Sequence, residues 1–293
     1  SIALVGHPNV GKSAIFQCLT GQRVTISNYP GTTVEITRGR SSLLPDASLL
    51  DTPGVVTFPP FSEDERVTAR VLLYEPLQAI LQVGDAKNLR RTLLFTLQLA
   101  EMGIPMVVAL NMVDEAAAHG IRLDTQALSN NLGFAFITTT ATQGHGISQL
   151  TNALCRAAPP VLELQYPPPI EQAILELETH LPAAPISPRA LALSWLSGDP
   201  VTTTWLVERC SNACVQLLEA IRSRTQAALH TSLPAQIQQT RLAYAEKLAA
   251  ESSTEVHPLR SDHRAALSSL TTHPVWGMLI LAGVLYLLYW FVG

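Results

Sequence analysis

Lys12 and Ser13 are the last two residues of a segment, 6–13, whose residue types and spacing suit it to chemistry. Residues 6–13, Gly-His-Pro-Asn-Val-Gly-Lys-Ser, fit the pattern G-x-x-x-x-G-K-[ST], and an apolar run at 2–5 precedes them. The glycines allow several main-chain N–H groups to point at one polyphosphate. Lys12 would place a positive charge near the β- and γ-phosphates, and the Ser13 hydroxyl would ligate magnesium. The run therefore predicts a phosphate-binding loop between a strand and a helix.

A second motif, Asp-Thr-Pro-Gly at 51–54, follows two leucines. As a carboxylate at a strand end, Asp51 would contact the magnesium ion through a water molecule. The N–H of Gly54 can reach the γ-phosphate. Between the two motifs lies a turn-rich segment, 28–35, of the kind that orders around a nucleotide. We expect the hydroxyl of Thr33, in that segment, to close on magnesium when the γ-phosphate is bound.

A third motif is suited to a purine base. The apolar run 105–110 predicts a buried parallel strand, which would deliver Asn111 and Asp114 at its carboxyl end, where open α/β sheets bind ligands. A carboxylate there can accept hydrogen bonds from N1–H and the 2-amino group of guanine. Adenine lacks this donor pair, so Asp114 is predicted to select GTP over ATP. Residues 140–142, Thr-Ala-Thr, follow another predicted strand and could brace the base through main-chain amides.

Together, and in this order along the chain, these motifs predict a guanine-nucleotide site with GTP or GDP and magnesium as its ligands. The predicted nucleotide contacts are Gly6, Asn9, Val10, Gly11, Lys12, Ser13, Ala14, Thr32, Thr33, Asp51, Gly54, Asn111, Met112, Asp114, Thr140, Ala141 and Thr142. The predicted magnesium ligands are Ser13, Thr33 and, through water, Asp51. The groups assigned to hydrolysis are Asn9, Lys12, Thr33 and Gly54.

The elements that must position these residues follow from an alternation of apolar and helical stretches between 79 and 156. Such alternation is typical of βαβ units, so residues 1–158 are predicted to form an α/β P-loop GTPase domain with a doubly wound, mostly parallel sheet. A cluster of prolines marks its end. Residues 159–256 then show helical patterns and no predicted strand. We expect a small all-helical coupling domain there, including one unbroken helix from 201 to 224.

The C-terminal segment has a different composition. Residues 274–293 contain no charged side chain and end in an almost continuous apolar run. About twenty apolar residues cross a bilayer, so a transmembrane helix is predicted here, with 257–273 as a juxtamembrane linker. A buried core helix is the alternative, but no polar face is visible. The chain opens on a predicted strand, without an initiator methionine or a signal peptide, and is expected to be a fragment whose further membrane helices lie outside it.

Over most of its length the chain resembles the ferrous iron transport protein B family. The similarity covers the phosphate loop, Asn-Tyr-Pro-Gly-Thr-Thr-Val-Glu at 28–35, Asp-Ala-Lys-Asn-Leu-Arg-Arg at 85–91 and Tyr-Pro-Pro-Pro-Ile-Glu at 166–171. The run 270–277 is similar to the approach to the family's first membrane helix. Residues 200–255 match only loosely.

This resemblance implies the GTP-binding and hydrolysing module of a ferrous iron transporter in the bacterial inner membrane. The GTPase and helical domains would lie in the cytoplasm, and a membrane domain outside this chain would handle the iron. Reordering of residues 22–35 and 51–66 with the nucleotide state would reach the membrane through the helical domain. The alternative is a soluble or membrane-anchored regulatory or assembly GTPase without transport.

Two positions bear on how GTP would be hydrolysed. In many small GTPases a glutamine directly after the DxxG motif orients the attacking water, but here that position is Val55, which cannot. Asn9 resembles the asparagine that helps to hold potassium against the phosphates in potassium-activated relatives, where the ion would stabilise charge in the transition state. An asparagine that only bonds its own loop is an equal alternative.

Composition excludes some other functions. The formal net charge of −4 and the pI near 6.1 argue against nonspecific nucleic-acid binding. The four cysteines show no disulfide framework, as expected in a reducing compartment, and for Cys210 and Cys214 small buried thiols are a simpler interpretation than a metal pair. The eight histidines lack metal-ligand spacing, so no ferrous iron site is expected in this chain. A homo-oligomer is left open.

Overall fold

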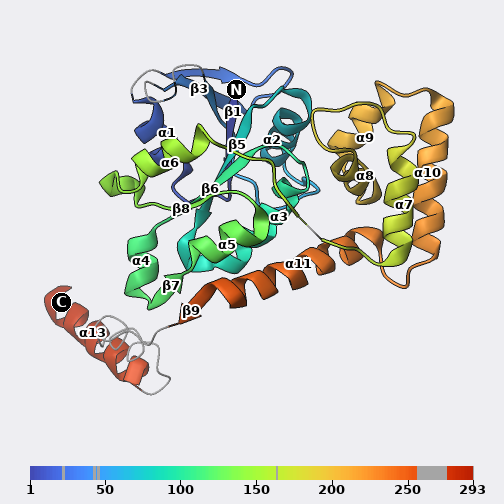
Figure 1. Cartoon of the computed structure of the whole chain (residues 1–293). Helices are drawn as coiled ribbons and strands as arrows, with labels where there is room; N and C mark the ends of the chain where they lie inside the picture. The colour runs from blue at the N-terminus through green and yellow to red at the C-terminus, as the bar shows by residue number, and fades with distance from the viewer. Residues whose placement is uncertain (22–23, 42–43, 45–46, 163, 256–275, 293) are drawn as a thin grey trace.

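A seven-stranded sheet lies at the centre of the first half of the chain, and Figure 1 shows helices on both of its faces. The computed structural model describes residues 1–293 except 22–23, 42–43, 45–46, 163, 256–275 and 293. The strands follow the order β2-β3-β4-β1-β5-β6-β8 across the sheet. Their bounds are β1 (Ile2–Gly6), β2 (Val24–Asn28), β3 (Glu35–Arg40), β4 (Ser48–Asp51), β5 (Ala79–Asp85), β6 (Met106–Asn111) and β8 (Phe136–Thr138).

Most of this sheet is parallel, as predicted. Strand β1 pairs in parallel with β4 and β5, and the β5–β6 and β6–β8 pairs are parallel too. Strands β2 and β3 are antiparallel additions at one edge. Strand β2 was not expected: all five of its residues are exposed, so the alternation of Val24 and Ile26 with polar residues buries no apolar face, and the strand is held by its pairing with β3. Its last residue, Asn28, is the first of the segment predicted as a turn-rich loop.

Successive residues of the strands face opposite sides of the sheet, and each side has its own apolar cluster. Ala3 and Val5 pack with α2, α3 and α5, whereas Ile2 and Leu4 pack with α1 and α6. The helices of this half of the chain are α1 (Lys12–Thr20), α2 (Glu63–Tyr74), α3 (Leu89–Ala100), α4 (Val113–Ala118), α5 (Thr125–Leu132) and α6 (Ile147–Leu154), with short 3-10 turns η1 (Ala86–Asn88) and η2 (Ala141–Gln143). The predicted doubly wound α/β domain is therefore confirmed.

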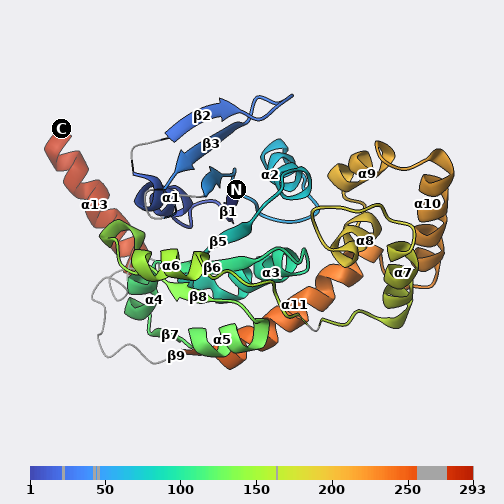
Figure 2. The same cartoon turned by 45° about the horizontal axis from the view of Figure 1, so that its top comes forward.

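A helical region follows, also as predicted, and Figures 1 and 2 show α7–α10 gathered to one side of the sheet. The expected single helix over 201–224 is wrong, because two helices occupy it. Ser211 separates them: its hydroxyl accepts a hydrogen bond from the Cys214 N–H (3.3 Å) and caps a new helix. The helices are α7 (Pro168–Glu178), α8 (Pro188–Leu196), α9 (Pro200–Val207), α10 (Asn212–Ala227) and α11 (Leu233–Ser252).

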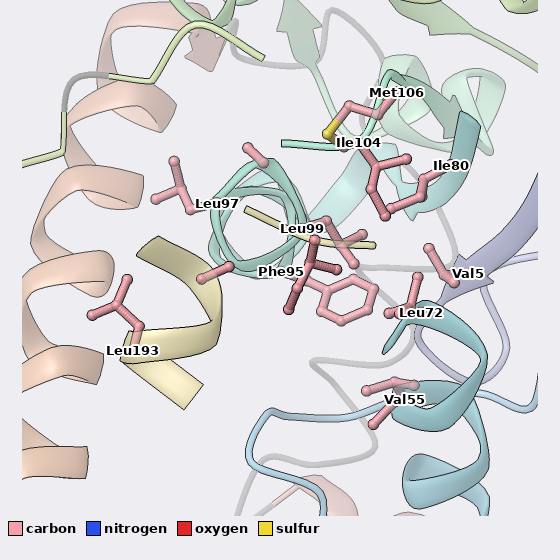
Figure 3. Close-up of a cluster of buried hydrophobic side chains, with 14 of the residues drawn as sticks. Val5, Val55, Leu72, Ile80, Phe95, Leu97, Leu99, Ile104, Met106 and Leu193 are labelled. Carbon is pink, nitrogen blue, oxygen red and sulfur yellow. The ribbon is translucent and has the colours of Figure 1, made fainter. Parts of the chain in front are cut away.

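The helical region and the α/β domain share one apolar core. Figure 3 shows Val5, Leu72 and Phe95 on the sheet side of this core and Leu193 of α8 on the other side. Helix α3 lies between them, since Phe95 faces the sheet while α11 packs along α3. The helical region is thus attached through buried side chains and not only through its linker.

A buried ion pair lies within this α3–α11 contact. The Arg241 guanidinium of α11 donates to the carboxylate of Glu101, just after α3, at 2.9 and 2.6 Å, and the two side chains are only 9% and 2% exposed. The Tyr166 hydroxyl, from the linker before α7, donates to Glu101 and accepts from Arg241 (3.1 Å). Burial raises the pKa of Tyr166, so the phenol stays protonated and donates. Three segments of the chain therefore meet at one satisfied polar cluster.

After α11 the chain returns to the α/β domain. Strand β9 (Ser253–Glu255) pairs antiparallel with β7 (Ile121–Leu123), which follows α4. The Asp124 N–H donates to the Ser252 carbonyl oxygen (2.8 Å) and extends this contact. The two-stranded sheet was not predicted, because both strands are only three residues long and carry no periodic signal.

The described part of the C-terminal segment is helix α13 (Trp276–Val292). Within the residues that the structure describes, no helix has both the length and the apolar character to span a membrane. The transmembrane helix predicted for 274–293 is therefore not confirmed, although a helix forms there. The predicted juxtamembrane linker, 257–273, lies outside the described residues.

Removal of one partner of the buried ion pair should destabilise the protein strongly. We expect Arg241→Met to cost about 3–5 kcal/mol of unfolding free energy, because it leaves the Glu101 carboxylate buried and unpaired. The double variant Glu101→Gln, Arg241→Met should recover part of this loss. Urea unfolding followed by circular dichroism measures both.

The matched control is Arg90→Met. Arg90 pairs with Glu246 across the same two helices (2.7 Å), but both side chains are about half exposed. Its loss should cost only about 0–1 kcal/mol. Equal costs for Arg90→Met and Arg241→Met would contradict the special role of the buried pair.

Candidate functional site

The phosphate loop joins the end of β1 to the start of α1, and two glycines leave no room for a side chain. A Cβ on Gly6 would lie 2.4 Å from the Val83 carbonyl oxygen, and one on Gly11 would lie 2.2 Å from Nδ2 of Asn111. Gly11 also has φ of 85°, in the left-handed region that favours glycine. The loop can therefore hold its backbone close to a ligand, as the motif predicts.

Opposite charges meet at the open side of this loop. Lys12, the first residue of α1, forms an ion pair with Asp51 at the end of β4, and each side chain is 12% exposed. The Ser13 hydroxyl donates to the other carboxylate oxygen of Asp51 (3.4 Å). Strands β1 and β4 are parallel neighbours, so their carboxyl ends bring these three residues together. A cation, a hydroxyl and a carboxylate are thus available at one point.

A cleft of about 570 Å³ opens beside this ion pair. Lys12, Asp51 and Thr33 all line it, so the predicted Thr33 shares one cleft with the ion pair. Thr32 does not line it: its hydroxyl donates to the Tyr29 carbonyl oxygen (3.0 Å) within the turn. Gly54 lies against the phosphate loop, because a Cβ there would come within 3.0–3.2 Å of Pro8.

Asn111 links the phosphate loop to the predicted base-binding loops. Its Nδ2 donates to the Val10 carbonyl oxygen (3.0 Å), while its Oδ1 accepts from the Thr139 hydroxyl (3.2 Å) and the Ala141 N–H (3.0 Å). The residue is buried. These bonds make Asn111 a support that joins the phosphate loop to the loop after β8.

Asp114 lies at the mouth of this region, in the first turn of α4. The Thr140 hydroxyl and the Gln143 amide both reach its carboxylate, at 3.5 and 3.4 Å, and the residue is exposed. Met112 precedes α4 with φ of 62°, a strained value for a side-chain-bearing residue. An exposed carboxylate held by two side-chain donors is suited to a hydrogen-bond donor edge, whereas the N–H groups of Thr140 and Ala141, predicted to brace the base, are already bonded to the His145 carbonyl oxygen and to Oδ1 of Asn111.

Sequence reasoning missed the residue that fixes the loop after Gly54. Glu65 of α2 accepts four main-chain hydrogen bonds, from the N–H groups of residues 56, 57, 61 and 62, at 2.9–3.2 Å. Burial alone would raise the pKa of Glu65, but these bonds outweigh it and lower the pKa. The available signal was Ser62 three residues before Glu65, the pattern of a capping box, which the structure contains.

A chain of aromatic rings joins the phosphate loop to the same segment. His7 meets Phe95 of α3 edge-on (5.2 Å between ring centroids), and Phe58 stacks on the same Phe95 ring (5.7 Å between centroids). Burial and the nearby charge of Arg91 lower the pKa of His7 to about 4, so its imidazole is neutral at physiological pH. The phosphate loop, α3 and the loop after Gly54 therefore pack as one unit.

The remaining predicted contacts lie in the phosphate loop, at the start of α1 and in η2. Val10 is buried and supplies the carbonyl that Asn111 bonds, Ala14 packs at the base of α1, and Asn9 is exposed in the loop with φ of 64°. Thr142 is exposed in η2. Thr139 was not predicted, because a buried strand-end threonine has no motif of its own.

The parallel sheet, the glycine-restricted phosphate loop after β1, the Asp51 carboxylate and the Asn111–Asp114 loop after β6 define a P-loop GTPase domain followed by a helical region. Two family models match the chain. One is described as "Ferrous iron transport protein B" and matches residues 1–154, and the other as "FeoB cytosolic helical domain" and matches residues 166–254. The chain belongs to the ferrous iron transport protein B family.

Individual proteins agree with this assignment. The Fe(2+) transporter FeoB of Escherichia coli K12 is 34% identical over 239 residues, which cover 78% of this chain and 31% of the transporter. The chain thus spans about a third of the length of the curated relatives it matches. The cytosolic domain of L. pneumophila FeoB has a TM-score of 0.76 at 28% identity, covering 86% of this chain and 99% of that one. The GDP form of the T. maritima cytosolic domain has a TM-score of 0.71 at 26% identity, covering 86% and 97%.

The lowered pKa of His7 predicts a dependence of stability on pH. The unfolded chain binds a proton below about pH 6.5, whereas the folded protein does so only near pH 4. Stability should therefore be complete above pH 6.5 and fall by about 3 kcal/mol as the pH drops toward 4. The measurement is thermal unfolding across this range, and His7→Gln should reduce the slope. His119→Gln, at an exposed position, is the control and should leave the slope unchanged.

Proposed function

We propose that residues 1–158 bind and hydrolyse GTP and that residues 159–256 couple this cycle to the membrane part of a ferrous iron transporter. The observation that carries the proposal is the position of Asp114, held beside Thr140 and Gln143 and tied through Asn111 to the phosphate loop. A similar cytosolic domain of T. maritima FeoB is a GDP form. GDP and GTP share the base and two phosphates, so the same residues serve both.

The phosphate end of the site fits a nucleotide with its magnesium ion. Lys12 supplies the cation for the phosphates, and the oxygens of Ser13, Asp51 and Thr33 are the hard ligands that magnesium prefers. When bound, the ion neutralises phosphate charge during transfer. Lys12 and Asp51 now neutralise each other, so nucleotide binding exchanges their ion pair for contacts with the ligand.

Water activation in this site does not use the side chain after Gly54. Val55 is fully buried, and its N–H donates to the Gly6 carbonyl oxygen (3.0 Å). We therefore assign charge stabilisation to the phosphate loop, with Asn9 holding a potassium ion. The Asn9 side chain forms no hydrogen bond with any residue that the structure describes, which favours this role over a purely structural one.

The coupling route follows from the shared core. The loop after Gly54 contacts α3 through Phe58, and Gln98 of α3 donates to the Phe58 carbonyl oxygen (3.4 Å) and to Gln238 of α11 (3.2 Å). A movement of this loop with the nucleotide state would therefore be transmitted to α11 through Gln98 of α3. The chain spans 31% of the relatives named as Fe(2+) transporters, and we assign iron movement to a part of the transporter other than these residues.

Base selectivity tests the proposed function. Titration calorimetry with magnesium should detect GTP binding and no comparable ATP binding, because adenine lacks the donor pair that Asp114 accepts. Asp114→Asn should weaken GTP binding by about a hundredfold or more. Glu115→Gln is the matched control, since the neighbouring Glu115 pairs with Lys87 (2.5 Å) and should leave affinity unchanged. Equal affinity for ATP and GTP would rule the assignment out.

Ion dependence tests the role of Asn9. We expect GTP turnover to be about tenfold or more faster in potassium than in sodium buffer, because an ion held at the phosphates stabilises the transition-state charge. Asn9→Ala should remove this difference while retaining GDP binding. A potassium response that survives Asn9→Ala would exclude the residue as a ligand.

A further inference from the structure

Strand β2 leaves one edge of the seven-stranded sheet without a neighbour among the described residues. It comes first in the order across the sheet, and Figure 2 shows it as the outermost strand. Its ladder with β3 includes the bond from the Tyr29 N–H to the Val34 carbonyl oxygen (2.9 Å). Because bonded and non-bonded pairs alternate along an antiparallel ladder, the main-chain groups of Thr25 point at β3, and those of Val24 and Ile26 point away from the sheet. The free edge therefore offers donors and acceptors at these two residues.

This edge has none of the features that usually block pairing. Natural edge strands are protected by lysine, by proline, by a bulge or by being very short. Strand β2 has five residues without a charge or a proline, and its register with β3 is continuous. Its apolar side chains, Val24 and Ile26, are 43% and 61% exposed on the same face. The opposite edge offers less, because β8 has three residues and its Phe136 N–H donates to the Ser129 hydroxyl (3.1 Å).

We propose that β2 pairs with β2 of a second copy of this chain, in an antiparallel ladder across a two-fold axis. An axis through Thr25 places Val24 of each copy opposite Ile26 of the other. Two pairs of β-branched side chains then form on one face of the joined sheet, and the two Thr25 side chains meet on the other. The same strand serves both copies, so the assembly closes as a dimer. The proposal does not depend on nucleotide binding or hydrolysis.

The residues of β2 favour a copy of the same strand and select this register. Like charges directly opposite each other destabilise a strand pair, and β2 carries none, so two copies do not repel each other there. A slip of one residue would set Val24 opposite Ser27, whose main-chain groups are already used by β3. A slip of two residues that sets Ile26 opposite Ile26 leaves only that one apolar pair. The register about Thr25 is therefore the one with two apolar pairs.

The size and the place of this interface set its expected strength. A ladder between two five-residue strands is smaller than a standard interface of about 1,600 Å², so the dimer is weak and transient. It adjoins the nucleotide cleft, because Ile26 pairs with Thr37 of β3 and Thr37 lines that cleft. A second copy would therefore hold the strand that leads into residues 28–35.

Cysteine cross-linking tests the register. The full chain is kept in nonionic detergent, because α13 exposes apolar side chains such as Leu281 and Phe291. In Thr25→Cys the two introduced thiols would face each other in a non-hydrogen-bonded pair, with Cα atoms about 4.5 Å apart, within reach of a disulfide. We expect oxidation with diamide to give a covalent dimer, and peptide mapping by mass spectrometry should join residue 25 to residue 25.

The matched control is Ser27→Cys, on the same strand and the same face and also exposed. In the proposed register the two copies of residue 27 lie about 14 Å apart along the strands, which is too far for a disulfide. This variant should cross-link at least about tenfold less than Thr25→Cys. Equal cross-linking of the two variants, or none in either, would overturn the proposal.

A charge at the edge tests the association without a cross-link. Ile26→Lys sets an ammonium group opposite Val24 of the second copy, and edge lysines oppose pairing. Because Ile26 is exposed, the fold should persist, which circular dichroism checks. Sedimentation velocity should show a dimer fraction that rises with concentration in the wild type and is at least about tenfold lower in Ile26→Lys.

Leu175→Lys is the control for this charge, since Leu175 of α7 is a similarly exposed apolar residue (64%) away from β2. It should associate as the wild type does. A wild-type chain that stays monomeric at every concentration would refute the dimer and leave the edge of β2 to a strand from another protein. Equal loss of the dimer in Leu175→Lys and Ile26→Lys would refute the assignment to β2.

Discussion

The hydrogen bonds of the Asn111 side chain hold the nucleotide site together. One amide group connects the Val10 carbonyl of the phosphate loop with Thr139 and Ala141 of the loop after β8. Since the residue is buried, each of these groups would otherwise lack a partner, and such a loss costs about 1–3 kcal/mol per group. Gly11 completes the fit, because only a residue without Cβ can pass so close to this amide. The spacing between the phosphate end and the base end of the site is therefore fixed by one side chain.

Helix α3 connects the nucleotide site to the helical region. Its Phe95 contacts His7 of the phosphate loop and Phe58 of the loop after Gly54, and its far side packs on α11. Glu101 ends the helix in the buried cluster with Arg241 and Tyr166. Because burial, aromatic packing and charge pairing all converge on one helix, the α/β domain and the helical region have little freedom to move apart there.

Much of the site could be predicted from sequence because its motifs are local. Lys12, Ser13, Asp51 and Asp114 each sit at a fixed offset from an apolar strand, and the parallel sheet then gathers the strand ends at one edge. Partners that are distant in sequence gave no such signal. Arg241 is 140 residues from Glu101, and the sequence around either residue does not predict the other as its partner. The break between α9 and α10 was missed for a different reason: apolar spacing continues across it, and only the capping side chain of Ser211 interrupts the helix.

The β7–β9 pair has a mechanical consequence. Strand β9 is the last described element before residue 256, and its partner β7 follows α4, whose first turn carries Asp114. Tension on the polypeptide beyond β9 would load the antiparallel ladder in shear, with the pull divided among its hydrogen bonds. One part of the load would then reach β7 and α4, at the purine end of the pocket, while the other would pass along α11 into the helical region.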